Sequence, residues 1–496
     1  MAILQAETES GAVRGTYAGN DSVSVFKGIP YAAPPVGELR WRAPQPAAAW
    51  TGVRPALEFS PVCWQEQMKP GTFYYKEFYG VEHPMSEDCL TLNIWTPACS
   101  ASEKLPVAFF IHGGGFTAGM GCNKSYDGEA FARNGVITVT FNYRVGAFGF
   151  LASRELTAED PHHTSGNYGI LDQIAALKWV RRNIAVFGGD PERITIFGQS
   201  AGGGSVQMLI SSPLAQQEIS GAIIQSSILL VPVRQPLNQT LEQAEAFGES
   251  FLAGIGVSSA AAGRALCAEE LMRRYLAFRG RRFALPFKVN VDQYVLQEDM
   301  LNGVLSGRHA RIPYMIGCTA DELDNGPLPE PEPLPAGASL REQIAQKIGP
   351  CCEEYVEILD RDKKDLAAMP PRWVSGCCAW SELQLAQGRA PVYQYLFTHQ
   401  APGGDQAGAF HSVEHPYVFG TLNRIWRPYT GEDWELSRIL TGYWCNFIKN
   451  GDPNGAGLPA WHPYTKAQPE VMELKPGPAM RRLMASPYIR FRRKDQ

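Results

Sequence analysis

The segment Gly198-Gln199-Ser200-Ala201-Gly202 matches the pattern Gly-x-Ser-x-Gly, which can place a nucleophilic hydroxyl on a sharp turn. The run 193–198 before the serine is rich in β-branched residues, and 205–211 after it is compatible with a helix. Between a strand and a helix, this common pattern becomes a nucleophile elbow: small neighbours avoid clashes, and the helix N-terminus faces developing negative charge. The segment therefore predicts acyl transfer through Ser200.

A second stretch, His112-Gly113-Gly114-Gly115-Phe116, follows the apolar run 105–111. Glycines let the backbone turn its N–H groups toward a pocket that no side chain blocks, as an oxyanion requires. An ordinary glycine turn is the alternative. A dinucleotide-binding loop fits poorly, because the spacing departs from Gly-x-Gly-x-x-Gly.

These residues need a rigid frame, and the apolar pattern predicts an α/β fold. Several apolar runs lack alternation, which is typical of parallel strands that are buried on both faces. One segment, 167–180, instead has apolar residues at helical spacing. The predicted strands are 105–112, 135–142, 193–198, 220–226 and 391–397.

The length of 496 residues suggests about three domains by size alone. However, the segments that could carry chemistry are spread along the chain, so we expect a single domain over 1–496. The segments at about 230–310 and 326–390 are then insertions that shape a substrate gorge. The second begins with a proline-rich stretch, 326–337, which is unsuited to a helix or a central strand.

Composition excludes several classes of protein. The net charge of −5 gives no basic surplus for nucleic acid, and no apolar run reaches the ~18 residues of a membrane span. The N-terminus lacks the features of a signal peptide, so we expect a cytoplasmic protein, or a secreted one whose signal has been removed. The pairs His162-His163, Cys351-Cys352 and Cys377-Cys378 lack metal-ligand spacing, so neither a metal nor a cofactor is expected.

The motifs together resemble the type-B carboxylesterases of the carboxylesterase/cholinesterase family, in particular bacterial p-nitrobenzyl-esterase-like enzymes. The resemblance covers nearly the whole chain and is carried by Phe187–Gly202, Glu87–Ile94, Phe26–Tyr31, Trp444–Phe447 and Gly451–Asn454. It implies an α/β-hydrolase fold, with a large, mostly parallel central sheet flanked by helices and with helical and loop insertions. It also implies hydrolysis of carboxylic esters, with a small-molecule ester as the partner.

The family order of serine, acid and histidine implies a triad of Ser200, Glu322 and His411. From chemistry alone, Asp321 and Asp324 are equally good acids, and the resemblance selects Glu322. His411 would accept the serine proton while Glu322 holds the imidazole in the right tautomer.

The family also assigns roles around the triad. The backbone N–H groups of Gly114, Gly115 and Ala201 would bind the oxyanion of the tetrahedral intermediate. Ser226 matches a serine that supports the acid, although a capped strand end explains it equally well. Gln199 stands where cholinesterases carry Glu, so one negative charge is missing and neutral esters fit better than choline esters.

Some questions stay open at this level. Cys63 and Cys89 match a family disulfide, but in a reducing compartment they would be free thiols. A non-catalytic binding or adhesion relative is an alternative, although such proteins commonly lose the serine or the histidine. Motifs do not separate an esterase from a lipase or an amidase of the same fold, and they leave monomer and dimer both possible.

Overall fold

The computed structural model describes residues 1–80, 82–227, 238–280, 287–322, 339, 342 and 372–482. The proline-rich stretch 326–337 and most of the second predicted insertion lie outside these residues. Within the described ranges, no helix is long and apolar enough to cross a membrane.

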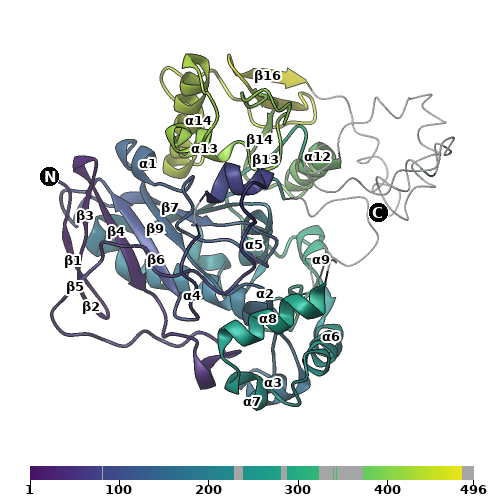
Figure 1. Cartoon of the computed structure of the whole chain (residues 1–496). Helices are drawn as coiled ribbons and strands as arrows, with labels where there is room; N and C mark the ends of the chain where they lie inside the picture. The colour runs from purple at the N-terminus through teal and green to yellow at the C-terminus, as the bar shows by residue number, and fades with distance from the viewer. Residues whose placement is uncertain are drawn as a thin grey trace.

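One sheet of eleven strands dominates the described structure (Figure 1). In the spatial order given next, every pair of neighbouring strands between β15 and β8 is parallel. The pairs β16–β15, β8–β6, β6–β4 and β4–β3, at the two edges, are antiparallel. The spatial order is β16 (Ala479–Arg482), β15 (Glu470–Leu474), β14 (Val392–Phe397), β13 (Tyr314–Thr319), β10 (Gly221–Gln225), β9 (Gly189–Gln199), β7 (Leu105–Ile111), β8 (Ile137–Phe141), β6 (Thr91–Thr96), β4 (Asn20–Pro30) and β3 (Thr16–Ala18).

Two small sheets and a set of helices accompany the large sheet. A three-stranded sheet contains β1 (Gln5–Thr8), β2 (Gly11–Arg14) and β5 (Val53–Pro55), and a two-stranded one pairs β11 (Gln239–Thr240) with β12 (Asn290–Val291). The α-helices are α1 (Glu129–Arg133), α2 (Gly146–Phe150), α3 (Arg154–Glu159), α4 (Tyr168–Asn183), α5 (Ala201–Ser211), α6 (Leu241–Gly254), α7 (Ala260–Ala265), α8 (Ala268–Arg279), α9 (Met300–Leu305), α12 (Arg372–Ala386), α13 (His415–Val418) and α14 (Gly431–Asn450).

Helices cover both faces of the sheet, which explains the unbroken apolar runs. In β7, Phe109 belongs to a core cluster that includes residues of α4, α5 and α12, whereas Phe110 belongs to a second cluster with residues of α13 and α14. Because alternate side chains enter opposite clusters, neither face of the strand can be polar. The predicted α/β architecture is thereby confirmed.

The helical part of the first predicted insertion is also present. Helices α6, α7, α8 and α9 lie between β10 and β13 in the chain and gather on one side of the molecule, apart from α14 (Figure 1). They interrupt the chain without interrupting the sheet, because β10 and β13 pair directly.

The helix after the serine begins earlier than the sequence predicts. The sequence indicates a start near Ser205, since glycines 202–204 disfavour helix, but α5 begins at Ala201. The glycines are needed for close packing. A Cβ at Gly202 would lie 2.0 Å from the carbonyl oxygen of Ile111, and one at Gly203 would lie 2.9 Å from that of Gln225. Tertiary contact therefore outweighs helix propensity here.

We expect Gly202→Ala to lower the free energy of unfolding by about 1–3 kcal/mol, because the new methyl group forces α5 away from β7. Urea denaturation measures the change. Gly431→Ala is the matched control: this glycine also lies in the first turn of a helix, but nothing is within 4 Å of its Cβ position. Equal stability of the two variants would contradict the packing explanation.

Candidate active site

Ser200 occupies a strained turn at the carboxyl end of β9. Its φ of +57° and ψ of −127° are unusual for a residue with a side chain, a conformation that costs about 1–3 kcal/mol unless its surroundings hold it. Two features hold this conformation. The Ser200 N–H donates to the carbonyl of Gln225 at 2.9 Å. Gly198 and Gly202 also lie so close together that a Cβ on Gly198 would be 2.6 Å from the carbonyl carbon of Gly202. The predicted elbow geometry is thus present, with Ser200 half-buried.

The segments expected to meet Ser200 all follow neighbouring parallel strands. The glycine loop follows β7, Ser200 follows β9, Glu322 follows β13 and His411 follows β14. Carboxyl ends of parallel strands share one edge of a sheet, which is where open α/β sheets place their ligands. Segments more than 200 residues apart in the chain are therefore brought to a single edge.

Glu322 is the acid that contacts His411. Its Oε2 accepts a short hydrogen bond from His411 Nδ1, and its Oε1 accepts one from the Thr319 N–H at 2.8 Å. Glu322 is only 1% exposed. The neighbouring Asp321 instead accepts from the Ala409 N–H at 2.6 Å and so braces the histidine loop. The third sequence alternative, Asp324, lies outside the described residues.

The imidazole of His411 is held in the tautomer that a general base needs. With the Nδ1 proton directed to Glu322, Nε2 is an acceptor, and the Gln199 Nε2 amide lies 3.1 Å from it. Of the three residues that the family order implies, Glu322 and His411 are joined by a hydrogen bond, whereas the Ser200 hydroxyl makes no hydrogen bond in the described part of the chain. Serine–histidine hydrogen bonds often tighten only when substrate binds.

Two opposing effects act on the pKa of His411. Burial lowers it, while the charge of Glu322, their hydrogen bond and the charge of Glu414 raise it, and the net result lies above the usual 6.5. The ring of Trp373, at the start of α12, packs against the imidazole with centroids 6.0 Å apart. This aromatic neighbour was not identified from the sequence, because its segment lacks a family motif.

The glycine loop presents backbone donors. Gly114 and Gly115 have φ of +111° and +62°, and a Cβ at Gly114 would lie 2.1 Å from the Ala118 carbonyl oxygen. Ala201 begins α5, so its N–H has no acceptor within the helix. Among the described residues, no acceptor is bonded to the N–H groups of Gly114, Gly115 or Ala201. All three residues retain solvent exposure.

Buried side chains fix the shape of this loop. The ring of His112 stacks on Tyr143 with centroids 4.2 Å apart, and the Tyr143 hydroxyl donates to the His112 carbonyl at 2.9 Å. Burial lowers the pKa of His112 to about 4, so the ring is neutral. Gln65 bonds both the N–H and the carbonyl of Gly119, at 2.7 and 3.0 Å. Sequence reasoning missed Gln65, which carries no recognisable motif.

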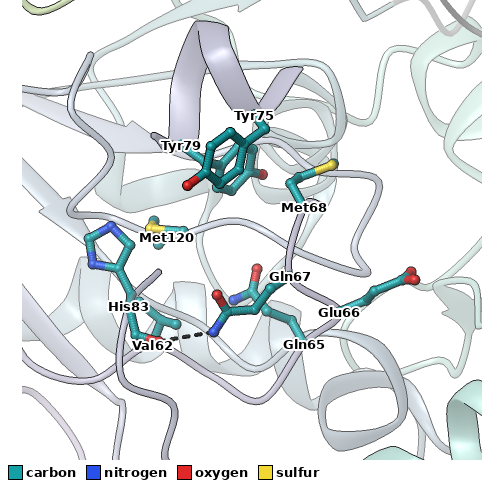
Figure 2. A pocket seen from close by; sticks show the side chains of 9 residues that line it. All are labelled: Val62, Gln65, Glu66, Gln67, Met68, Tyr75, Tyr79, His83 and Met120. Atoms are coloured by element: carbon teal, nitrogen blue, oxygen red, sulfur yellow. Dashed lines mark hydrogen bonds between the residues drawn. The ribbon is translucent and has the colours of Figure 1, made fainter. Parts of the chain in front are cut away.

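Gln65 also lines a pocket, which Figure 2 shows. In the figure, Tyr75 and Tyr79 face Met68 and Met120 across it, and a dashed line marks the hydrogen bond from Gln67 to the His83 carbonyl. The full lining is Val62, Gln65, Glu66, Gln67, Met68, Tyr75, Tyr79, His83 and Met120. None of the predicted site residues lines this pocket, which is therefore separate from the residues at the sheet edge.

Two predicted details differ in the structure. The Ser226 hydroxyl has no hydrogen-bond partner among the described residues, so it does not bond Glu322. Its N–H donates to the Gly317 carbonyl at 2.8 Å, as the alternative of a strand end implies.

Cys63 and Cys89 are free thiols, and the predicted disulfide is not formed. The two thiols lie within hydrogen-bonding distance of each other. This hydrogen bond, together with burial, raises the pKa of Cys89 well above its usual value.

A buried ionic cluster packs against the loop that carries His411. Arg427 has no exposed side-chain surface; its Nη2 lies 2.7 Å from Glu77 Oε1 and 3.0 Å from Asp405 Oδ2. Its guanidinium lies 5.2 Å from the ring centre of Phe410, the residue before His411, and Phe73 packs edge-on against the same ring. The cluster thereby joins the segment around the short helix η2 (Tyr75–Tyr79) to the loop that carries His411.

Comparisons with known proteins identify the family and the fold of the chain. The model of the carboxylesterase family matches residues 3–326 and 362–492. A fumonisin B1 esterase of Sphingopyxis macrogoltabida is 36% identical, with 95% of this chain and 86% of the relative covered, and a para-nitrobenzyl esterase of Bacillus subtilis is 34% identical, with 92% and 93% covered. A solved carboxylesterase of Geobacillus stearothermophilus superposes with a TM-score of 0.80 at 35% identity, covering all of both chains.

The sheet, its flanking helices and the elbow define an α/β-hydrolase fold. Within that class, the chain belongs to the carboxylesterase family. It is a carboxylic ester hydrolase that acts on small-molecule esters.

We expect Glu77→Gln to reduce the free energy of unfolding by about 3 kcal/mol, because the buried Arg427 charge loses its closest partner and retains only Asp405. Chemical denaturation measures this change. Glu435→Gln is the control, since its partner Arg438 is more than half exposed and its loss should leave stability unchanged. Equal effects of the two substitutions would show that the cluster is not stabilising.

Proposed function

We propose that Ser200, His411 and Glu322 hydrolyse neutral carboxylic esters through an acyl-enzyme. The observation that carries the proposal is the hydrogen bond between Glu322 and His411 Nδ1 at the sheet edge where Ser200 occupies the elbow. This arrangement leaves Nε2 free to act as the base, and Ser200 is a half-buried serine in a strained turn directly after strand β9 of the same sheet.

Acylation begins when the Ser200 hydroxyl replaces the Gln199 amide at His411 Nε2. As Oγ attacks the ester carbonyl, its proton passes to Nε2, and the carbonyl electrons move onto oxygen. Glu322 stabilises the resulting imidazolium. When the intermediate collapses, the alcohol leaves with the proton from Nε2, and the acyl group stays on Ser200.

The oxyanion is bound by the N–H groups of Gly114, Gly115 and Ala201. Their lack of acceptors among the described residues supports this role, because donors that are already free need no rearrangement as charge develops. One such donor is typically worth about 2.7–4 kcal/mol of barrier. Water, activated by the same histidine, then releases the acid and regenerates the hydroxyl.

A single catalytic domain is consistent with this mechanism. Each triad residue follows a strand of the same sheet, and the helices α6 to α9 form an excursion between two paired strands. The excursion and the second insertion would border the substrate gorge.

Ser200→Ala should reduce kcat/KM for a short p-nitrophenyl ester by roughly 10⁴-fold or more, because the acyl-enzyme cannot form. Covalent labelling by a serine-directed organophosphate should disappear in parallel. Ser226→Ala is the matched control, since this serine also follows a sheet strand but is 1% exposed. It should retain both activity and labelling. Full activity of Ser200→Ala would rule out the proposed nucleophile.

The substrate preference follows from Gln199, which places a neutral amide beside His411. We expect higher kcat/KM for 3,3-dimethylbutyl acetate than for acetylcholine, two esters that match in shape and differ in charge. The name of the para-nitrobenzyl esterase relative likewise refers to a neutral alcohol group. Gln199→Glu should narrow the difference. A preference for acetylcholine in the unchanged enzyme would contradict the assignment to neutral esters.

A further inference from the structure

Sulfur and imidazole donors gather at the pocket that is separate from the sheet edge. His83 and Met120 both line this pocket (Figure 2). The Cys122 Sγ lies 3.8 Å from His83 Nδ1. Met120 and Cys122 are buried in one small cluster, and Met85 packs against that cluster. Two short segments of the chain therefore each supply two side chains that can bind a metal ion.

Backbone hydrogen bonds hold both of these segments in place. The Val62 N–H donates to the Pro84 carbonyl, and the Ser86 N–H donates to the Val62 carbonyl, both at 2.9 Å. On the other segment, the Gly121 N–H donates to Asn142 Oδ1 at 2.8 Å. The donors are therefore positioned by the fold, so an ion that binds them does not have to order a loose loop.

The separation of Cys122 and His83 suits two ligands of one ion. Thiolate and imidazole ligands of a d¹⁰ ion such as Zn²⁺ lie about 2.3 and 2.0 Å from the metal. With those bond lengths, an S···N separation of 3.8 Å gives a ligand–metal–ligand angle of about 120°. Such an angle leaves a third position open on the side away from the pair.

A methionine thioether is the donor that can fill this third position. Among the described residues, no three His, Cys, Asp or Glu side chains are grouped so that they could hold a metal ion. A zinc site with its usual four ligands is therefore not built here. Thiolate and thioether sulfur are soft ligands that select Cu(I), which is d¹⁰ like Zn²⁺ but carries a single charge.

The charge of the site also favours a monovalent ion. Cys122 contributes one negative charge as a thiolate, and imidazole and thioether donors are neutral. A monovalent cation then forms a neutral unit, whereas a divalent cation leaves a net positive charge in a cluster of buried apolar side chains. The carboxylate of Glu66, which also lines the pocket, is already paired with Arg279.

We propose that Cys122, His83 and Met120 form a binding site for a soft monovalent metal ion, with Cu(I) as the ligand. Burial raises the pKa of the Cys122 thiol to about 11, so the thiol is protonated before the ion arrives. On binding, its proton passes to solvent and its sulfur bonds the metal, while His83 Nδ1 and the Met120 sulfur each contribute a lone pair. No electron is transferred. Sequence spacing gives no sign of this site, because its donors come from two separate segments.

The test measures binding of Cu(I) to the whole chain without oxygen, in competition with the chromophoric chelator bicinchoninate. Cys99 and Cys267 are exposed, and Cys351 and Cys352 are adjacent thiols, so all four are first replaced by serine to remove competing sites. In this background, we expect Cys122→Ser to lower the number of tightly bound ions by one per chain.

Two further variants test the other ligands. His83→Ala and Met120→Leu should each weaken binding by about 10–100-fold or more, since the loss of an outer partner of a metal ligand already has an effect of that size. Met120→Leu nearly conserves volume, so its effect reports the sulfur and not the packing. Copper X-ray absorption should show a nitrogen ligand in the background protein that is lost in His83→Ala.

Cys445→Ser is the matched control, because Cys445 is also buried but makes no hydrogen bond with a histidine in the described chain. It should retain the full number of ions. Cu(I) should also raise the Tm of the background protein and not that of Cys122→Ser, and the same scans check that each variant is folded.

An unchanged number of bound ions in folded Cys122→Ser would overturn the inference, as would a copper spectrum without nitrogen in the background protein. The outcome is independent of the catalytic proposal. Ser200→Ala should bind Cu(I) as the unchanged chain does, so either proposal can fail while the other stands.

Discussion

The close approach of helix α5 to strand β7 is the contact from which the site is built. With a hydrogen atom in place of a side chain, Gly202 lets the first turn of the helix approach the Ile111 carbonyl. That approach leaves Ser200 in its left-handed conformation and puts the first N–H of the helix next to the glycine loop that follows β7. The proposed nucleophile and the proposed oxyanion donor at Ala201 are thus placed by a single steric condition.

A second constraint is electrostatic. Glu322, His411 and Glu414 are all nearly or fully buried and therefore lie in a region of low dielectric. Because charges are poorly screened there, the charge of each group affects the pKa of the others. The surrounding polar partners, such as the Thr319 N–H and Gln225, are backbone or neutral groups that orient the acids without adding charge.

Much of the fold was predictable because apolar pattern and glycine spacing report directly on burial and turns. The strands at β7, β8, β9, β10 and β14 were placed to within a few residues of their observed bounds. The start of α5 was misplaced, since local propensity does not register the contact of Gly202 with a strand ninety residues earlier. For the acid, chemistry alone does not distinguish Asp321 from Glu322; the family resemblance selects Glu322, and in the structure Glu322 bonds His411 whereas Asp321 bonds the Ala409 N–H. Gln65, Trp373 and Glu414 were missed, because their roles depend on contacts with distant segments.

The Arg427 cluster can form only after a residue near the end of the chain has been synthesised. Glu77 and Arg427 are 350 positions apart, and the guanidinium is fully enclosed once they meet. A chain emerging from the ribosome therefore carries an unpaired Glu77 until nearly its whole length has been made. This support for the loop bearing His411 therefore requires residue 427 and the closure of a loop of 350 residues. A truncated product that ends before Arg427 would include Ser200, Glu322 and His411 but not the guanidinium that packs against Phe410, next to the histidine.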